Sequence, residues 1–485
     1  MARIAVIGGS VGGLATALFA ARRDHQVTVF ERDSPHATGD LEADFARGRV
    51  RAPQTVQPHN FIAPVRTVLR TEAPDVFARM LALGAHETHE FEKLADRPVM
   101  LPGDEDLITT LARRILLETA LAEAVLREPS VELRHRDPVA GLVIRTGRVP
   151  HVIGVRTGDG EYSADLVVDA AGRRSPVGRW LRDAGCRPPV VDAQRIDLMY
   201  ACRWYRLPGD LPMRLPKSSG SPFAQGLVFP ADGRVFAIGL AVAVSDPART
   251  TLRDEAVFEA AARAFPACAG WLAEGAKPIS PVHVMAGLEN RWTALADEQG
   301  PVVLGLAGVG DSVTHTNPTL GQGCSQALLA AQRLASALDS PDGSEAFAIA
   351  HHRWTADKLK PWFDHQRSVD RRIVASLAGA EPSSRDIRDL RDDERLGTAV
   401  AACAGRDVAV LRAKSRVRHL AATPDVAYAE PAARAVLDEW LAENPDPAPA
   451  FDGPSRAEWD RITRPPSAAD QGYPANLGPR FHGYP

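Results

Sequence analysis

The stretch RIAVIGGSVGGLATALFAARRDHQVTVFE, residues 3–31, decides the fold. It opens with a short apolar run, passes through a glycine-rich turn at 8–13, continues as a helix-like segment and ends in a second apolar run that closes on Glu31. Glycines permit a tight turn, and the helix N-terminus that follows favours an anionic group. Strand, turn, helix, strand and terminal acid together predict a dinucleotide-binding unit in which Glu31 bonds ribose hydroxyls.

The turn departs from the GxGxxG pattern at one position. Ser10 stands where the pattern has its middle glycine, between Gly8 and Gly13. That glycine normally lets the backbone approach the phosphates, so a small side chain must be tolerated there. We interpret Ser10 as a permitted variant.

A second informative stretch is GDSVTHTNPTLGQG, residues 310–323, between a strand-like apolar run and a helix-like segment. Asp311 at the strand's end can accept a hydrogen bond from a sugar or polyol hydroxyl, and Pro318 stiffens the loop. Gly321 and Gly323 let the backbone approach a planar ligand. The helix that begins near Gly323 favours an anionic group above its N-terminus, which suits a reduced flavin ring.

A third stretch is ADLVVDAAGRRSPVGRWL, residues 164–181. An apolar strand ends in Asp169, and small residues then turn the chain next to several arginines. Taken alone, this pattern is equally typical of a strand followed by a basic surface turn.

In this order, the three stretches resemble the FAD-dependent monooxygenases related to para-hydroxybenzoate hydroxylase. The form DAAGRRS, with Ala170 in place of a glycine, resembles the DATGRGS pattern of a bacterial branch that includes flavin epoxidases and related tailoring enzymes. RVRAPQTVQPH (49–59) resembles that branch's RKGVPQxxHxH. RRILLETAL (113–121) resembles a segment whose arginine reaches the FAD and aligns with Arg114. The resemblance covers most of residues 1–345.

The resemblance implies FAD as the cofactor. Glu31 would bind the adenosine ribose, Asp311 would hold the ribityl chain, and Arg114 with Arg49 or Arg51 would neutralise phosphates or touch that chain. The full set of cofactor-binding residues that it implies is Gly8, Ser10, Val11, Gly12, Gly13, Glu31, Arg32, Arg49, Arg51, Gln54, Arg114, Val139, Asp169, Gly310, Asp311, Pro318, Gly321, Gln322 and Gly323.

The resemblance also implies the chemistry. A flavin C4a-hydroperoxide formed from O2 would donate oxygen to the substrate, with NAD(P)H or a separate flavin reductase as the electron donor. The protein would position the reactants and exclude water from them. Pro318 and His315 would lie at the catalytic centre. His315 could protonate the peroxide, touch the ring edge or make only a structural loop contact, and these alternatives stay open.

We predict an α/β fold with a Rossmann-like FAD-binding domain, an interleaved mixed-sheet substrate domain and C-terminal helices. The predicted boundaries are 1–185 plus 296–345 for the FAD-binding domain, 186–295 for the substrate domain, 346–444 for the helices and 445–485 for a Pro/Gly-rich tail. A hairpin turn is expected at 231–233. Candidate pocket residues for a hydrophobic substrate are Met199, Tyr200, Trp204, Phe229 and Phe236. The alternative is that alternate members of this set form the core of the sheet.

Composition narrows the classes of partner and location. The chain has 485 residues and a formal net charge of -4, with arginines and acids interspersed, so a nucleic-acid surface is not expected. Its five cysteines are far apart, which predicts neither disulfides nor a zinc site and favours a cytoplasmic protein. His86 and His89 have a metal-like helical spacing without further ligands, so no metal is expected. No apolar run is long enough to span a membrane.

These observations favour an FAD-dependent monooxygenase that epoxidises or hydroxylates a hydrophobic small molecule, which we expect to be a secondary metabolite. Two alternatives stay open: an FAD-dependent reductase or dehydrogenase acting on a prenyl or polyketide double bond, and a non-catalytic flavin-binding protein. Halogenation is disfavoured, because no two tryptophans stand two residues apart as in the WxWxIP motif of FAD halogenases.

Overall fold

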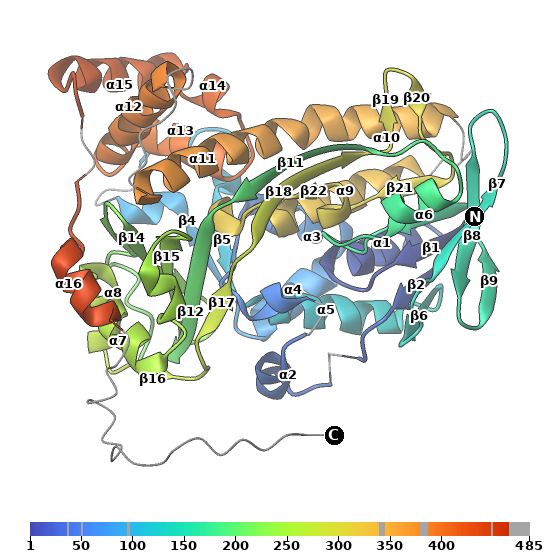
Figure 1. Cartoon of the computed structure of the whole chain (residues 1–485), viewed down its shortest axis with the longest axis horizontal. Coiled ribbons are helices and arrows are strands. Elements are labelled where there is room, and N and C mark those ends of the chain that lie inside the picture. Colours follow the sequence, from blue (N-terminus) through green and yellow to red (C-terminus); the bar gives the residue numbers. More distant parts are fainter. Residues whose placement is uncertain are drawn as a thin grey trace, which may run out of the picture.

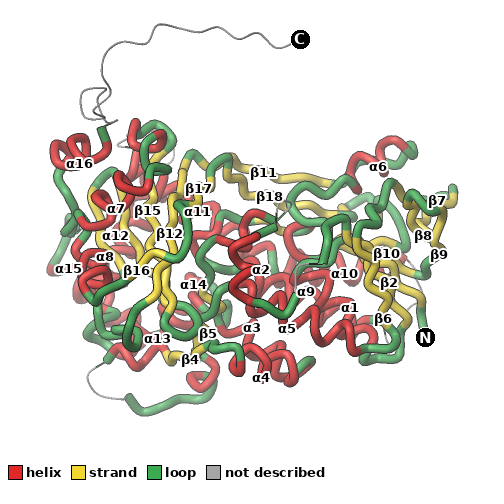
Figure 2. Tube along the Cα trace, turned by 90° about the horizontal axis from the view of Figure 1, so that it is seen from below, coloured by secondary structure: helices red, strands yellow, loops and turns green. Residues whose placement is uncertain are grey.

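The computed structural model shows an elongated α/β molecule with a sheet-based unit at each end (Figures 1 and 2). A long antiparallel ladder of β11 (Val190–Ile196) and β18 (Leu288–Ala294) runs between the two units. The α/β class predicted from the sequence is thereby confirmed. The residues that the structure describes are 1–35, 38–49, 52–94, 98–338, 345–378, 387–447 and 450–464.

One unit is built on a parallel five-stranded sheet in the order β21-β10-β1-β2-β6. The strands are β1 (Arg3–Ile7), β2 (Gln26–Glu31), β6 (Val131–His135), β10 (Leu166–Asp169) and β21 (Leu306–Gly308). The central strands are continuously apolar because both faces of the sheet are covered. Helices α1 (Val11–Ala21) and α9 (Gly323–Ala337) cover one face, and α6 (Val177–Asp183) with a small antiparallel sheet covers the other.

Further elements pack around this sheet. The small sheet on its second face is β7 (Gly141–Arg145), β8 (His151–Thr157) and β9 (Gly160–Ser163). A second layer behind α1 consists of α3 (Ala63–Glu72), α4 (Pro74–Ala82) and α5 (Arg114–Arg127). Next to that layer lies the antiparallel sheet β3 (Asn60–Phe61), β5 (Ile108–Leu111) and β4 (His86–His89). The shorter elements are α2 (Leu41–Arg47), β19 (Ala296–Asp297) and β20 (Gly300–Pro301). His86 and His89 are thus in a strand, and the helical spacing predicted for them is wrong.

The other unit is an antiparallel sheet in the order β13-β14-β15-β12-β16, with β17 also paired to β12. Its strands are β12 (Leu198–Arg206), β13 (Ser218–Ser221), β14 (Ala224–Pro230), β15 (Val235–Ala243), β16 (Lys277–Pro278) and β17 (His283–Met285). The predicted turn at 231–233 joins β14 to β15, and Gly233 has φ +57° there. Helices α7 (Glu255–Arg263) and α8 (Pro266–Ala273) bury one face of the sheet.

The C-terminal helices cover two different surfaces. Helix α10 (Glu345–Lys358) leads into α11 (Lys360–Ala378), which lies along β11 and β18 (Figure 1). The other helices are α12 (Ile387–Cys403), α13 (Val408–Arg418), α14 (Pro424–Ala427) and α15 (Pro431–Glu443). They form a separate group whose core includes Phe91 and Leu107 rather than the substrate sheet. Of the helices at 345–443, α11 is therefore the one that packs on the β11–β18 ladder and on β15.

Part of the predicted tail packs against the body. Residues 450–464 follow the outer side of the antiparallel sheet, where Asp452 accepts a hydrogen bond from Gly220 N at 3.0 Å. Helix α16 (Arg456–Thr463) inserts Trp459, which is fully buried, into the core shared with α7 and α8. Residues 465–485 lie outside the described part of the chain.

Candidate functional site

The three glycine-containing motifs meet at the carboxyl ends of the parallel strands. Gly8 lies against the backbone of Ala170, since a Cβ on Gly8 would stand 2.6 Å from the Ala170 carbonyl oxygen. Ser312 Oγ, beside Asp311, donates a hydrogen bond of 2.6 Å to the carbonyl oxygen of Asp169. Three stretches that are about 150 residues apart in sequence therefore form one continuous edge, which is where open α/β sheets bind ligands.

The turn at 8–13 needs glycine at two positions. Gly8 has φ +107°, and a Cβ on Gly13 would stand 1.9 Å from the carbonyl oxygen of Gly8. No side chain could occupy either position without moving the backbone. Gly12 differs, because a Cβ there would lie 3.6 Å from its nearest neighbour, Ala327 Cβ, which is ordinary contact.

Ser10 occupies the N-cap position of α1 but does not cap the helix. Its hydroxyl instead accepts a hydrogen bond from Arg114 at 2.8 Å and donates one to Glu118 at 3.1 Å. Both partners are on α5, so the side chain points away from the first amides of α1. Those amides have no partner within the helix and stay without a side-chain cap, as an anion-binding helix terminus requires.

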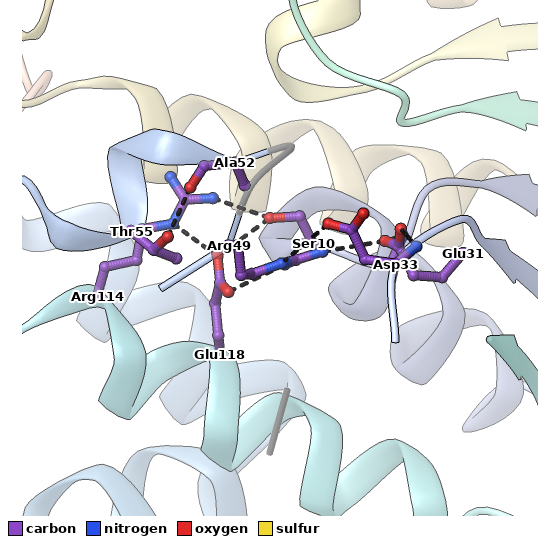
Figure 3. Close-up of polar contacts among 9 residues, drawn as sticks. Ser10, Glu31, Asp33, Arg49, Ala52, Thr55, Arg114 and Glu118 are labelled. Atoms are coloured by element: carbon purple, nitrogen blue, oxygen red, sulfur yellow. Dashed lines mark hydrogen bonds and ion pairs between the residues drawn. The ribbon is translucent and has the colours of Figure 1, made fainter. Parts of the chain in front are cut away.

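Two arginines converge on one buried carboxylate beside Ser10 (Figure 3). Glu118, which has no exposed surface, accepts hydrogen bonds from Arg114 Nε at 2.7 Å and from Arg49 at 3.1 Å. Burial alone would lower the pKa of both guanidinium groups, but their pairing with Glu118 outweighs it and raises both pKa values. Both arginines are therefore fixed cations at the site.

Glu31 lies at the end of β2, as predicted, and its carboxylate is already engaged. One oxygen accepts from Gly9 N at 2.8 Å and from Arg49 at 3.1 Å, and the other accepts from Asp33 N at 2.8 Å. Arg49 Nε and Asp33 Oδ2 are 3.8 Å apart, and both are buried without a hydrogen-bond partner in the described structure. This edge of the site thus holds one donor and one acceptor that a ligand can satisfy.

Asp311 and His315 form a pair at the start of the loop after β21. His315 is held in the two-residue strand β22 (Thr314–His315), and its Nδ1 is 3.1 Å from Asp311 Oδ2. Burial would raise the pKa of Asp311, but His315 and the positive charges of Arg114 and Arg173 lower it below its usual value. Asp311 is therefore an anionic acceptor. His315 contacts Asp311, which favours the structural alternative for this histidine.

The loop continues through a 3₁₀ turn at Pro318–Leu320 to Gly321, which has φ +68°. Pro318 and Thr319 are exposed on the surface of this turn. Helix α9 then begins at Gly323, as predicted, with no side-chain cap from Gln322. Its first amides are thus as open to a ligand as those of α1.

The remaining predicted cofactor residues lie around these groups with less definite roles. Gln54 lies in a 3₁₀ turn at Pro53–Val56, and Val139 packs against the core beneath the sheet. Arg32 is exposed, and Gln322 is buried and accepts a hydrogen bond from Gln326. Arg51 lies outside the described residues. Their roles toward a cofactor stay predictions.

The predicted substrate residues are divided between two faces of the antiparallel sheet. Tyr200, Trp204 and Phe229 lie on the face toward the loops of the parallel-sheet unit: Tyr200 contacts Asn317, and Trp204 Nε1 donates to Val56 O at 2.7 Å. Met199 and Phe236 lie on the opposite face. They are buried in the core with α7 and α8. Grouping all five in one pocket was wrong, because side chains alternate between faces along a strand.

Three site residues were missed by the sequence reasoning. Glu118 carried one signal, its i,i+4 spacing from Arg114 on a helix. Asn290 and Asp370 carried none, because they come from β18 and α11 and meet the loop at Asn317 only in the folded chain.

Several other candidate chemistries find no support in the described part of the chain. No group of three or more His, Cys, Asp or Glu side chains there is placed to hold a metal ion. All five cysteines are free and buried, and burial raises the pKa of Cys324, next to the loop, to about 11. Among the described helices, none has the length and apolar character needed to cross a bilayer.

The buried carboxyl of Asp169 makes stability depend on pH. Burial raises its pKa from 3.8 to about 6, although Ser175 and Ala171 N donate hydrogen bonds to it. The folded state then holds the proton more tightly than the unfolded state, so the contribution of Asp169 to stability is greatest at low pH and is lost as the pH rises from about 4 to about 6. The difference corresponds to about 3 kcal/mol.

We therefore expect Asp169→Asn to stabilise the FAD-free protein by up to about 3 kcal/mol at pH 8 and by almost nothing below pH 4. Urea unfolding at several pH values measures this. Asp165→Asn is the matched control, because a hydrogen bond from Arg3 N lowers the pKa of Asp165 and its loss destabilises at pH 8. A pH-independent effect of Asp169→Asn would contradict the assignment.

The residues present fit an FAD molecule. Two uncapped helix N-termini, two fixed guanidinium groups and the acceptor Asp311 lie along one edge, and Gly8 and Gly13 keep that edge free of side chains. Diphosphates bind such helix termini, and a polyol hydroxyl suits Asp311.

Comparisons with known proteins agree with this architecture. No family model matches the chain. Protein Rv3254 of Mycobacterium tuberculosis is 27% identical over 428 residues, which is 81% of this chain and 85% of the relative. The crystal structure of PqsL, a probable FAD-dependent monooxygenase from Pseudomonas aeruginosa, superposes with TM-score 0.60 at 18% identity, covering 78% of this chain and 98% of that chain. The flavin-dependent brominase Bmp2 gives TM-score 0.59 at 13% identity, covering 91% and 98%. The chain therefore has the fold of these flavin-dependent enzymes.

Proposed function

We propose that this chain is an FAD-dependent monooxygenase that inserts one oxygen atom of O2 into a hydrophobic small molecule by epoxidation or hydroxylation. The observation that carries the proposal is the convergence of the three motifs on one edge, between two uncapped helix N-termini. The fold shared with FAD-dependent oxygenases supports it. Oxygen transfer is the chemistry for which a flavin next to an apolar sheet face is suited.

Each half of the site has a separate binding duty. The amides of α1, with Arg49 and Arg114, hold the diphosphate, and Asp311 accepts a hydrogen bond from the ribityl chain. The N-terminus of α9 stabilises negative charge on the reduced ring. When bound, FAD supplies the activation of O2. His315 keeps Asp311 oriented.

The substrate side has to exclude water, because activated oxygen is otherwise lost to solvent. The face of the antiparallel sheet that carries Trp204 and Phe229 is apolar, and Tyr200 lies between it and the loop at 317–319. Trp204 is itself fully buried, so Tyr200 and Phe229, which are partly exposed, are the residues of this face that can meet a hydrophobic molecule. Electrons would come from NAD(P)H binding transiently or from a separate flavin reductase, since the sequence has no second glycine-rich dinucleotide turn.

The deciding experiment is stopped-flow spectroscopy of the FAD-loaded, chemically reduced protein mixed with O2, with and without aromatic, terpenoid and polyketide candidates. A spectral transient that needs O2 and decays faster with a productive substrate supports oxygen transfer. Slow oxidation without a transient, together with reduction of a prenyl or polyketide double bond, supports the reductase alternative. Tight ligand binding without turnover supports a flavin-binding protein.

Asp311→Ala should weaken FAD binding about tenfold or more, because a hydrogen bond to a charged group contributes about 1.5–3 kcal/mol. Fluorescence titration of FAD measures the dissociation constant. Asp297→Ala is a control at a partly exposed ion pair with Arg187 and should bind FAD as the wild type does. Equal affinity in the Asp311 variant would remove this residue from the proposed site.

A further inference from the structure

The loop that carries Pro318 is anchored from behind by a buried polar cluster. Asn317 directly precedes the exposed Pro318 and Thr319, but its own side chain is 1% exposed and turned inward. Its Nδ2 donates a hydrogen bond of 2.7 Å to Asp370 Oδ1. Asp370 lies on α11, in a part of the chain where no sequence motif was recognised.

One carboxylate fixes both the side chain and the backbone of Asn317. Besides Asn317, Asp370 accepts from Asn290 Nδ2 at 2.7 Å and from Gln366 Nε2 at 2.9 Å. Asn290 Oδ1 in turn accepts from the backbone N–H of Asn317 at 2.7 Å. Because Asp370 orients Asn290 as well, the side-chain amide and the backbone N–H of Asn317 both depend on the same carboxylate.

The cluster also reaches the antiparallel sheet. Asn317 Nδ2 is 3.0 Å from the hydroxyl of Tyr200 and 2.6 Å from Thr319 Oγ1, and the two hydroxyls are 3.0 Å apart. Asp370 is therefore linked, through one amide, to the loop expected beneath the flavin ring and to the face expected to hold substrate.

This arrangement is costly for the fold. Asp370 has no exposed surface, its hydrogen-bond donors are neutral amides and the hydroxyl of Thr319, and no ion pair of its carboxylate is present among the described residues. A buried carboxylate without a cation is expensive, and burial raises its pKa. Groups of this kind cluster at functional sites, where they fix a geometry that packing alone would not.

We propose that Asp370 is a positioning residue for the flavin ring, which acts by locking the Asn317 amide and with it the Pro318–Thr319 turn. This inference rests on the proposed FAD site. The negative charge of Asp370 also lies behind the loop that faces the ring. It therefore disfavours the reduced, anionic flavin and lowers the midpoint potential of the bound FAD.

The test compares Asp370→Asn with Asp364→Asn. Asp364 is an exposed residue of the same helix, paired with Lys360. One amide oxygen cannot accept from three amides, so Asp370→Asn leaves buried donors unpaired. We expect FAD to bind about tenfold more weakly. We also expect the midpoint potential of bound FAD to become more positive, with reduced FAD favoured over oxidised FAD about threefold, which corresponds to about 14 mV for two electrons. In the FAD-free full chain, hydrogen exchange across residues 314–321 should become faster. Asp364→Asn should change none of these.

A double-mutant cycle tests whether Asp370 acts through Asn317. Asn317→Leu should weaken FAD binding as Asp370→Asn does, and the double variant should be no worse than either single variant. Additive losses, or an Asp370→Asn variant with unchanged potential and loop exchange, would overturn the proposal. If Asp370→Asn cannot be purified folded, unchanged FAD affinity in Asn317→Leu overturns it alone. If the wild-type protein binds no FAD, the proposed function is overturned as well. If the wild-type protein turns over substrate but the variants do not differ from it in FAD binding, potential or loop exchange, only this inference is overturned.

Discussion

Replacing Gly13 by alanine should abolish FAD retention and destabilise the protein by about 3 kcal/mol or more. The same change at the adjacent Gly12 should do neither, because the expected contact of Gly12 with FAD is through its backbone N–H, which an alanine keeps. The Cβ at position 13 would stand 1.9 Å from the Gly8 carbonyl oxygen, and 3.3 Å from the Cβ of Ala170. Gly8 cannot retreat, because it is itself pressed against the Ala170 backbone with φ +107°. The clash must therefore open the turn.

Gly12 offers a control one residue away. Its added Cβ would make ordinary contacts of 3.6 Å with Ala327 and 3.7 Å with Val309. Alanine in the first turn of α1 also reduces the entropy of the unfolded chain, so Gly12→Ala should be neutral or stabilising by up to about 1 kcal/mol. Thermal unfolding and the FAD content per purified chain measure both variants. Equal behaviour of the two would mean that the turn adapts, and that Gly13 is not required by its geometry.

The same turn shows how far the sequence could be read. The types of residue and their order in the chain were enough to predict β1, α1, β2 and the start of α9 at Gly323. This is because local propensity and the constraints on glycine depend on consecutive residues. The meeting of the three motifs also followed, since parallel strands present their carboxyl ends at one edge. These parts of the fold depend little on residues far away in the sequence.

The failures have a common physical origin. β12 and β15 are buried on both faces, so hydrophobicity did not tell which face of Met199 or Phe236 meets the loops and which meets α7 and α8. The helical spacing read into His86 and His89 failed because their short segment pairs with β5. Tertiary pairing overrides local pattern in such short segments.

Buried charges were the hardest part to predict. Glu118 meets Arg49 across 69 residues, and Asp370 meets Asn317 across 53. A charged residue in a helix is expected on the solvated face, and only the folded arrangement shows that these two are fully enclosed. The residues that set the geometry of the site were thus charged residues, which a reading of the sequence alone would place on the surface.

Arg113 is a third such residue, and its replacement by methionine should cost about 3–5 kcal/mol. Its guanidinium is 1% exposed and hydrogen-bonds Asp232, in the turn between β14 and β15, and Glu42 on α2. Its backbone N–H also donates to Asp232 at 2.8 Å. Removing the cation leaves Asp232, which is 4% exposed, as a buried anion without a counter-charge. The free energy of unfolding, measured by urea denaturation, reports the loss.

Arg206→Met separates this effect from the loss of any surface ion pair. Arg206 shares Glu42 with Arg113, but both ends of the Arg206–Glu42 pair are about half exposed, at 44% and 51%. Solvent screening limits such a pair to about 0–1 kcal/mol. Combining Arg113→Met with Asp232→Leu should recover part of the loss, because the stranded charge is then removed with its partner. If Arg113→Met costs no more than Arg206→Met, the junction between the two sheet units is held by apolar packing alone. A large loss of stability in Arg113→Met that the double variant partly recovers would instead show that Arg113 holds the junction. Loss of the Arg113 contacts would also displace the neighbouring Arg114 from Ser10.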